Sequence, residues 1–376
     1  MADGMQLKKY IRLNTKINSF SYPILIGRNI LRTLPKEISK FTKSKKVLIL
    51  CDKIFKNKTL KIITSSMKRK YDMDVQLITP GKKSKNINNA IRILSFLEKN
   101  RYSKDSTLIA LGGGTIGDLG GFVASVYYRG MNLVLIPSTL TAQIDSSYGG
   151  KVAVNFNNNV NAIGNYFHPK LVICDYGFIQ SLPTREFNAG MSEVVKSALI
   201  SSKSDCNFLL KNFKKIKKRN LLIISKMISR IIKIKLKIVK KDVRENNVRM
   251  FLNYGHTIGQ SIEASTNLNL EVYRHGEAVS LGMTVAAKLS SLVFFKKNNI
   301  FDYHLRILKI FDLPTKISKK INKTNLKYKI FKNLFKDKKV NFQGVRFVLL
   351  KEIGNPQIVS KINENKIKSS INCILS

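Results

Sequence analysis

A glycine-rich segment, IALGGGTIGDLGGF, is the clearest local feature with chemical meaning. Gly112, Gly114 and Gly117 satisfy the spacing G-x-G-x-x-G directly after a run of aliphatic residues. Glycines allow backbone amides to approach a pyrophosphate, and the start of a following helix favours its negative charge. No acidic residue lies about 20 residues further on, so the segment departs from the usual dinucleotide fingerprint. The pattern alone leaves nucleotide binding and a closely packed turn as alternatives.

Two histidines and one glutamate form a second candidate site. His256 lies in LNYGHTIG, His275 in HGEAV and Glu193 in GMSEVVK, and each histidine is expected near the start of a helix. Two imidazoles and one carboxylate are the usual ligands of an open zinc site, which leaves coordination positions for substrate oxygens. These residues spread over about 80 positions and match no compact metal signature. The spacing therefore also permits histidines that only pack and hydrogen-bond in a helical core.

Polar residues gather between the glycine loop and the middle of the chain. Apolar runs flank this region, and polar side chains beside strand ends indicate a site at the carboxyl edge of a sheet. The segment SSYGGK delivers a lysine from a glycine turn, as an anionic ligand requires. A solvated loop is the alternative. The residues concerned are Asp118, Arg129, Ser138, Thr139, Asp145, Lys151, Asn155 and Asn161.

The elements that must position these residues can be read from hydrophobic patterning. Short aliphatic and β-branched runs predict buried strands, and the periodic segments at 56–71 and 86–100 predict helices between the first three of them. Strand and helix in alternation indicate a parallel sheet with crossover helices. The expected strands are 47–52, 75–79, 107–111, 133–137 and 171–175.

The second half has a different pattern. The segments at 184–200, 221–243 and 277–295 have helical periodicity, and a strand pair at 345–350 and 356–360, with Gly354 in its turn, returns only near the end. A short connection at 181–185 separates the halves, so we expect a sheet domain at 1–182, a mostly helical domain at 183–376, and a cleft between them. The expected fold class is α/β, with a Rossmann-like parallel-sheet domain followed by a helical metal-binding domain.

Composition sets the broad class. The 376 residues carry 67 Lys and Arg against 23 Asp and Glu, a formal net charge of +44, and 44% are hydrophobic. This apolar content supports folded domains and excludes a wholly disordered chain. No apolar run approaches the ~20 residues of a membrane helix, and the first residues are too polar for a secretory signal. We therefore expect a cytoplasmic protein that does not associate with a membrane. The four cysteines lack metal or disulfide spacing, so we expect free thiols.

Six segments, in this order, resemble the 3-dehydroquinate synthase family of the shikimate pathway. They are GGGTIGDLGGF, YYRG, IPSTLTAQIDSSYGGKVAVN, LPTREFNAGMSEVVK, LNYGHTIG and HGEAV, and the likeness runs from about Val47 to Gly354. The resemblance implies a homodimer that binds NAD in its first domain and Zn²⁺ or Co²⁺ in its second. It implies conversion of 3-deoxy-D-arabino-heptulosonate 7-phosphate to 3-dehydroquinate with release of phosphate. Temporary oxidation of a ring hydroxyl fits this chemistry, because a ketone acidifies the neighbouring C–H bond.

The resemblance also assigns roles to residues. The implied metal ligands are Glu193, His256 and His275. Residues implied to hold NAD are Asp52, Gly81, Lys85, Gly114, Thr115, Ile116, Gly117, Asp118, Ser138, Thr139, Lys151, Phe178 and Ser181. Residues implied to line the substrate pocket are Asp145, Lys151, Asn161, Lys196, Lys235, Arg249 and Asn253, with Arg129 reaching the partner subunit's site and Lys338 or Lys339 adding a further cation. This set of cations suits a substrate with a carboxylate and a phosphate.

Three residues depart from the family pattern. Gln260 stands where the family usually has a second histidine, four residues after His256 and on the same helical face. Val160 replaces a lysine before Asn161, and Lys82 replaces an acidic residue. Gln cannot titrate near neutral pH, and losing one charge-assisted hydrogen bond costs about 1.5 to 3 kcal/mol. We therefore expect a working but slower synthase.

Two other functions remain as alternatives. A related sugar-phosphate cyclase or a metal-dependent polyol dehydrogenase would share the architecture, and net NADH accumulation would reveal the dehydrogenase. The excess of +44 and stretches such as KNFKKIKKR also suit a non-catalytic basic binding protein. Lysine is spread along the whole chain and no nucleic-acid reader motif accompanies it, so we expect no specific nucleic-acid partner.

Overall fold

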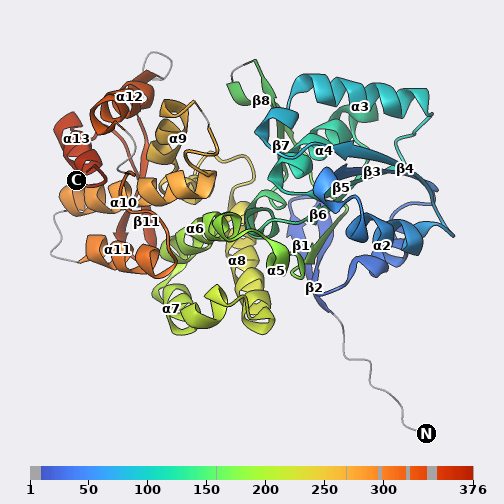
Figure 1. Cartoon of the computed structure of the whole chain (residues 1–376), viewed down its shortest axis with the longest axis horizontal. Coiled ribbons are helices and arrows are strands. Elements are labelled where there is room, and N and C mark those ends of the chain that lie inside the picture. The colour runs from blue at the N-terminus through green and yellow to red at the C-terminus, as the bar shows by residue number, and fades with distance from the viewer. Residues whose placement is uncertain are drawn as a thin grey trace, which may run out of the picture. The chain divides into compact units, whose positions relative to one another are not determined.

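The computed structural model describes residues 10–157, 159–267, 269–294, 299–318, 322–336 and 345–375. They form two compact units, which follow one another along the colour ramp of Figure 1. The first unit comprises the described residues up to Leu182 together with Ile224–Ile232, and the second comprises Pro183–Ile223 and the described residues from Lys233 onward. The main division therefore falls after Leu182, while nine residues in the middle of a later helix group with the first unit.

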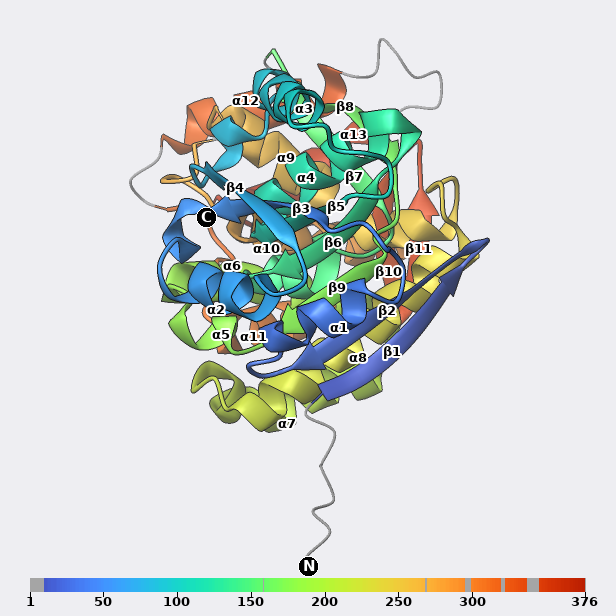
Figure 2. The same ribbon diagram turned by 90° about the vertical axis from the view of Figure 1, so that its right-hand side faces the viewer.

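A seven-stranded, mostly parallel sheet forms the centre of the first unit, so the predicted fold class is confirmed. Figure 2 shows its strands side by side in the order β1-β2-β9-β6-β5-β3-β4. Only β1 runs antiparallel to its neighbour. The strands are β1 (Tyr10–Ile17), β2 (Phe20–Gly27), β3 (Lys46–Asp52), β4 (Asp72–Ile78), β5 (Thr107–Gly112), β6 (Asn132–Pro137) and β9 (Leu171–Asp175).

The strand order creates a switch point between β3 and β5. After β3 the chain moves outward to β4, and then returns to place β5 on the other side of β3. In open parallel sheets, ligands bind in the crevice beyond the carboxyl ends of the strands at such a reversal. Asp52 ends β3 and Gly112 ends β5, so both lie at this edge of the sheet.

Both faces of the sheet are covered by helices, which explains why its central strands are continuous apolar runs. Alternate residues such as Ile49 and Ile109 pack in one core with residues of α1 (Leu34–Ile38) and α2 (Lys58–Met67). The intervening residues face α4 (Gly114–Val126), where a Cβ at Gly120 would lie only 2.9 Å from the Cβ of Ala110. Helix α3 (Ile87–Lys99) packs against α4, and α5 (Phe178–Ser181) follows β9.

A β-hairpin, β7 (Lys151–Phe156) and β8 (Asn159–Tyr166), forms a separate two-stranded sheet that packs against α4. The patterning predicts no strand here. The sequence also predicts Lys151 in a flexible turn, but Lys151 is the first residue of β7. The turn itself comes just before it, where Gly149 and Gly150 have positive φ. The residues of β8 are mostly exposed and polar, so they lack the apolar run that marks a buried strand.

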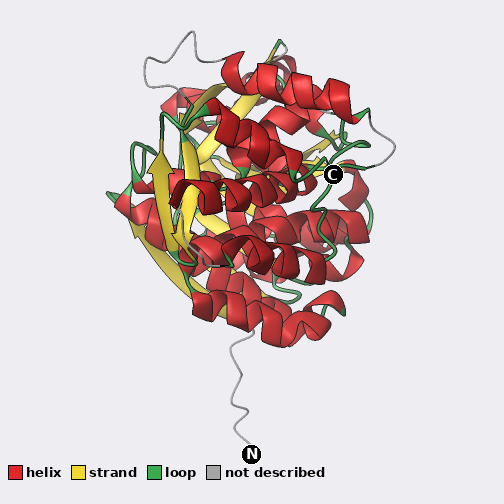
Figure 3. Ribbon diagram, turned by 90° about the vertical axis from the view of Figure 1, so that its left-hand side faces the viewer, coloured by secondary structure: helices red, strands yellow, loops and turns green. Residues whose placement is uncertain are grey.

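The second unit is mostly helical, as predicted, and helices dominate the view in Figure 3. Its strand pair, β10 (Phe347–Glu352) and β11 (Asn355–Val359), has Gly354 at φ +85° in the turn, also as predicted. Ser202 begins one helix as an N-cap, since its hydroxyl accepts from the amide of Asp205 at 3.1 Å. The helices are α6 (Thr184–Ser201), α7 (Lys203–Lys217), α8 (Leu221–Lys241), α9 (His256–Ser265), α10 (His275–Phe294), α11 (Ile300–Ile310), α12 (Lys323–Lys336) and α13 (Glu364–Asn372).

Helix α10 is the core helix of the second unit. It packs against α6, α9, α11, α13 and β10. By length and composition alone it could cross a membrane, but 67% of its apolar window is buried inside the protein. Its hydrophobic character therefore serves the packing of the unit that carries the two histidines.

The four cysteines are free thiols, as their spacing predicts. Three of them are buried, and burial raises the pKa of the Cys51 thiol to about 12. A thiol with so high a pKa is a poor nucleophile and a poor metal ligand at neutral pH.

Candidate functional site

Three side chains from three helices converge in the second unit. Glu193 lies in α6, His256 is the first residue of α9 and His275 is the first residue of α10. One ligand atom from each lies within 4.8 Å of the others. The Nε2 atoms of both histidines lie 3.6 Å from Oε1 of Glu193. The structure thus brings together the three residues that the sequence indicates as metal ligands.

This geometry fits a divalent metal ion. Two ligand atoms held about 2.0–2.1 Å from a tetrahedral zinc ion lie roughly 3.3 Å apart, close to the separations found here. At 3.6 Å the imidazole nitrogens are too far from the carboxylate for ordinary hydrogen bonds. Oε1 of Glu193 is buried and accepts no hydrogen bond within the part of the chain that the structure describes. A buried acceptor of this kind, facing two imidazoles, suits a metal ligand.

The opposite edges of the imidazoles are held by acceptors. Nδ1 of His275 lies 3.0 Å from Oε2 of Glu263, and Nδ1 of His256 lies 3.3 Å from the carbonyl oxygen of Tyr254. Each Nδ1 therefore acts as the donor, so Nε2 is the nitrogen of each imidazole that faces Glu193. Tyr254 is fixed in turn, because its hydroxyl lies 2.9 Å from Nε2 of the buried His304.

Charges around the triad act on its ionisation. Lys196, itself 1% exposed, forms an ion pair with Oε2 of Glu193. Burial disfavours the charged carboxylate, but Lys196 and the two histidines outweigh this and hold the pKa of Glu193 well below its usual range. Desolvation, assisted by Lys196, lowers the pKa of His256 to about 4. Desolvation also opposes the charged form of His275, but Glu193 and Glu263 raise its pKa to about 9. Glu193 is therefore ionised and His256 neutral at neutral pH, whereas His275 must release a proton when it binds a metal ion.

A guanidinium clamp ties the start of α6 to the start of α10. Arg185 donates from Nε and from a terminal nitrogen to the two carboxylate oxygens of Glu277, both at 2.8 Å. The same guanidinium donates to the carbonyl oxygens of Glu271 and Val272. Since α6 carries Glu193 and α10 begins with His275, the clamp fixes the helices that supply two of the three ligands.

We expect Arg185→Lys to lower the free energy of unfolding by about 1–2 kcal/mol, because lysine cannot make the paired hydrogen bonds of the planar guanidinium. Thermal and denaturant unfolding would measure the loss. Glu277→Gln should cost a similar amount, and the double variant should cost less than the sum of the two. Asp312→Asn, which removes an exposed ion pair with Lys217, is the control and should change stability little. Strict additivity of the two clamp substitutions would contradict the clamp.

In the first unit, the glycine loop lies at the switch point of the sheet. It connects β5 to α4, and a Cβ at Gly112 would lie 3.3 Å from the Cβ of Asp52 at the end of β3. Ser138 follows β6, and its amide donates to the carbonyl of Gly112 at 2.9 Å. A Cβ at Gly113 would lie 3.0 Å from the Thr139 side chain. The structure therefore gathers Asp52, Ser138 and Thr139 around a loop whose helix, α4, begins at Gly114 and includes the predicted Thr115, Ile116, Gly117 and Asp118.

The other predicted NAD residues are distributed more widely over the first unit. Lys85, 8% exposed, forms an ion pair with Asp118 and donates to Oδ1 of Asn161 at 2.6 Å. Gly81 has φ +109°, a conformation that favours glycine, in the turn after β4. The ring of Phe178 packs against Phe55, at 5.2 Å between centroids. Ser181 ends α5, and its hydroxyl donates to the carbonyl of Phe178.

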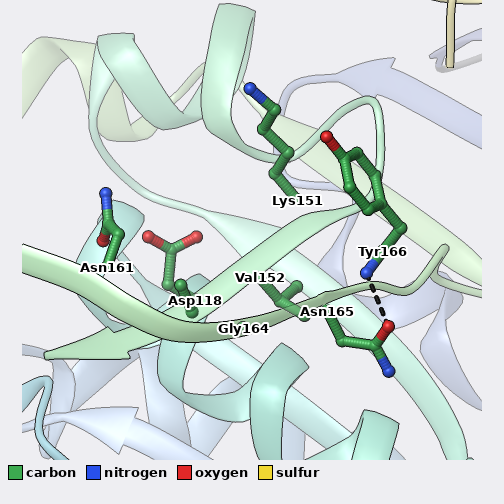
Figure 4. Close-up of a pocket in the computed structure, with 8 residues that line it drawn as sticks. Asp118, Lys151, Val152, Asn161, Gly164, Asn165 and Tyr166 are labelled. Carbon is green, nitrogen blue, oxygen red and sulfur yellow. Dashed lines mark hydrogen bonds between the residues drawn. The ribbon is translucent and has the colours of Figure 1, made fainter. Parts of the chain in front are cut away.

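A cavity of about 410 Å³ lies between the hairpin β7–β8 and α4. In Figure 4, Lys151 and Tyr166 lie on one side of it, and Asp118 and Asn161 on the other. The exposed ammonium of Lys151 and the amide of Asn161 give this cavity donors for an anionic ligand. The structure thus places three predicted site residues, Asp118, Lys151 and Asn161, around one cavity.

Two further predicted residues of the first unit lie in unusual backbone. Asp145 belongs to a short π-helix, 142–146, a form that is rare and frequent at functional sites. Arg129 is exposed at φ +60° and follows Tyr128 at φ +47°. Left-handed conformations in two adjacent non-glycine residues cost of order 1–3 kcal/mol each, and such strain clusters at functional sites.

The remaining predicted substrate residues lie in the second unit. Lys235 in α8 is 7% exposed and Arg249 is 2% exposed. The backbone amide of Arg249 donates to Oδ2 of Asp242 at 3.0 Å, and Asn253 donates from its amide nitrogen to Oε1 of Glu245 at 2.8 Å. The carboxylates of Asp242 and Glu245 therefore support the short 3₁₀ helix Val248–Asn253, which contains Arg249 and Asn253.

Two of the three departures from the family pattern, Gln260 and Val160, lie at exposed positions. Gln260 lies one turn after His256 in α9 and is exposed, and Val160 in β8 is 44% exposed. Lys82 begins the short helical turn 82–84 after β4. Lys338 and Lys339 lie outside the described residues.

Sequence reasoning missed the residues that support the site. Glu263, Tyr254, His304 and Glu245 do not form a motif with the residues they hold. One signal was available, since Glu263 follows His256 by seven residues and two helical turns return a side chain to the same face.

Several solved structures share this fold. A 2-deoxy-scyllo-inosose synthase complexed with carbaglucose-6-phosphate, NAD⁺ and Co²⁺ has a TM-score of 0.86 at 20% identity, covering 97% of this chain and 100% of that one. A 2-epi-5-epi-valiolone synthase from Streptomyces hygroscopicus, with NAD⁺ and Zn²⁺ bound, has a TM-score of 0.83 at 19% identity, covering 96% and 98%. An iron-containing alcohol dehydrogenase has a TM-score of 0.65 at 14% identity, covering 94% and 97%. At these identities the likeness shows that this chain shares their fold.

Sequence comparison identifies the family. Residues 75–189 match the N-terminal domain of 3-dehydroquinate synthase, and residues 190–340 match its C-terminal domain. The 3-dehydroquinate synthase of Thermodesulfovibrio yellowstonii is 39% identical over 363 residues, covering 96% of this chain and 99% of that protein. That of Buchnera aphidicola is 39% identical over 355 residues, covering 94% and 98%. The chain belongs to the 3-dehydroquinate synthase family, which confirms the resemblance seen in its motifs.

Proposed function

We propose that this chain is a phosphate-eliminating carbon–oxygen lyase that converts 3-deoxy-D-arabino-heptulosonate 7-phosphate to 3-dehydroquinate. The observation that carries the proposal is the convergence of Glu193, His256 and His275 in a member of this family. A related sugar-phosphate cyclase is the second candidate. The solved cyclases favour it by fold alone, at about half the sequence identity of the synthases.

The chain's own residues have distinct tasks in this reaction. When bound, NAD accepts and returns a hydride, and a divalent ion such as Zn²⁺ or Co²⁺ polarises substrate oxygens. Glu193, His256 and His275 hold the ion, and the Nζ of Lys196 occupies Oε2 of Glu193 so that Oε1 faces the imidazoles. The glycine loop and Asp52 hold NAD at the switch point of the sheet.

We assign four side chains to the anionic groups of the substrate. Lys151 and Asn161 line the cavity of the first unit, Lys235 and Arg249 are buried or nearly buried in the second, and each carries donors that suit a phosphate or a carboxylate. We assign substrate contacts also to Asp145, Lys196 and Asn253. The first unit is accordingly the NAD domain and the second the metal domain.

We further propose a cytoplasmic homodimer in which Arg129 contacts the partner subunit. Its exposure and its strained backbone, next to the exposed ring of Tyr128, support such a role. Light scattering coupled to gel filtration would measure the mass in solution. A monomer at micromolar concentration would contradict the dimer.

Phosphate release from the heptulosonate phosphate tests the proposed function. The assay uses the purified chain with and without chelator and with and without added NAD. We expect phosphate release that requires NAD and a divalent metal ion and is therefore lost with chelator. No net NADH should accumulate, because the cofactor is regenerated. Steady NADH production from a polyol would instead favour a dehydrogenase. Turnover of a different sugar phosphate, with none of the heptulosonate, would favour a related cyclase.

Restoring the family residues should raise activity. We expect Gln260→His with Val160→Lys to increase kcat/KM about 100-fold, because each change restores a polar or cationic contact worth about 1.5 kcal/mol, roughly tenfold, and the two factors multiply. Asn159→Lys is the matched control, since it adds the same charge to β8 one residue earlier, on the opposite side of the strand. An equal gain from the control would show that only added positive charge matters. No turnover above a metal-free blank, even after both reversions, would refute a working synthase.

A further inference from the structure

Glu263 contacts the proposed metal centre without belonging to its ligand set. Its carboxylate is buried, at 6% exposure, and Oε2 lies 3.0 Å from Nδ1 of His275. Glu263 lies in α9, the helix that begins with His256. Seven residues are close to two turns, so one face of α9 carries one ligand and the carboxylate that touches the other.

The contact determines which nitrogen of His275 faces the site. An ionised carboxylate can only accept, so Nδ1 of His275 must donate to Glu263 and Nε2 is the nitrogen left to bind a metal ion. That Nε2 is the atom 3.6 Å from Oε1 of Glu193. His256 has the same arrangement with a weaker acceptor, because its Nδ1 faces the neutral carbonyl of Tyr254 at 3.3 Å. A charged acceptor makes the shorter and stronger hydrogen bond.

The contact also affects the charge balance of the site. Glu193 forms an ion pair with the buried Lys196, which offsets its negative charge. The two imidazoles are neutral when they act as ligands. The carboxylate of Glu263 therefore supplies negative charge that the Glu193–Lys196 pair does not, next to the position of a divalent cation.

We propose that Glu263 is a positioning residue of the metal centre, whose buried carboxylate fixes the His275 imidazole with Nε2 toward Glu193 and strengthens binding of the divalent ion. The inference rests on the proposed metal site. If Glu263 only stabilised the packing of α9, its replacement would not be expected to change metal affinity. The proposed positioning role predicts that it does.

Zinc affinity, measured by competition with a chromogenic chelator near neutral pH, tests this role without any enzyme assay. We expect Glu263→Ala to weaken Zn²⁺ binding about 10- to 100-fold, the usual effect of removing such a supporting group. Glu263→Gln keeps an acceptor of the same size but loses the charge, so we expect a smaller loss. The matched control is Glu271→Gln in the same unit, whose side chain is 81% exposed and whose affinity should equal that of the unaltered chain.

Each outcome decides a different question. Equal zinc affinity in Glu263→Ala and the unaltered chain would overturn the positioning role. An equal loss in Glu271→Gln would also overturn it, because net charge alone would then explain the effect. If Glu263→Ala does not fold by circular dichroism, Glu263→Gln decides, and unchanged affinity in that variant refutes the role. Absence of zinc binding in the unaltered chain would refute the proposed metal site itself.

Discussion

Replacing His275 by alanine is expected to remove divalent metal binding and to lower phosphate release by at least about 10³-fold. Metal polarisation of a substrate oxygen contributes several kcal/mol to the transition state, and a 10³-fold loss corresponds to about 4 kcal/mol. His275 provides one of the three ligand atoms that lie within 4.8 Å of one another, so its loss leaves only Glu193 and His256. Isothermal titration with Zn²⁺ and the phosphate-release assay measure the two effects separately.

Glu193→Gln provides an independent route to the same loss. It preserves size but removes the ligand charge and leaves the buried ammonium of Lys196 without its counter-ion. We therefore expect loss of metal binding together with a lowered unfolding temperature, whereas His275→Ala should chiefly affect metal binding. Glu271→Ala, at an exposed position, serves as the control. Full activity of His275→Ala in the presence of chelator would refute the metal site.

The sequence predicts those parts of the structure that depend on local pattern. The central strands β3, β5, β6 and β9 are buried on both faces, and each appears as a continuous apolar run. The two histidines were predictable as candidate metal ligands because few imidazoles lie beside glycines at helix starts, whereas Glu193 lies in the middle of α6 and was assigned as a ligand only by the family motif. The family motifs then distinguished ligands from packing histidines.

Two kinds of strand were not predictable from the pattern: strands without an apolar run, and strands with a proline next to the run. β8 is exposed along nearly its whole length and has no apolar run. β2 contains Pro23, and a proline within a segment argues against a strand because it lacks an amide donor. Strand order was equally hidden, because the placement of β5 beside β3 depends on long-range packing. The switch point that joins Asp52 to the glycine loop follows from that order and from nothing local.

Supporting contacts are hidden for the same reason. Glu263 and His275 are separated by a loop. His304 lies in α11, whereas Tyr254, whose hydroxyl it contacts, lies in the turn before α9. Nothing in residue type marks such a carboxylate or imidazole among the others. The sequence therefore indicated the candidate metal ligands, while the structure shows which contacts hold them in place.

The crossing of α9 and α10 provides the second large expected effect. A Cβ at Gly282 in α10 would lie 1.9 Å from the carbonyl oxygen of Gly255, the residue immediately before His256. Real Cβ contacts are almost never shorter than 3.0 Å, so Gly282→Ala must move the start of α9 by about 1 Å. Gly255 cannot easily adjust, because it has φ +79° and is itself packed against Met283.

We expect Gly282→Ala to lower zinc affinity and activity by about 100-fold, the scale of a 1 Å misplacement in a catalytic site, and to lower the unfolding temperature. Ser291→Ala, at a partly exposed position of the same helix, is the control and should retain both properties. Helix propensity alone predicts the opposite, since alanine stabilises a helix interior by about 1 kcal/mol relative to glycine. A Gly282→Ala variant that is more stable and binds zinc normally would therefore show that α9 and α10 can separate without disturbing His256.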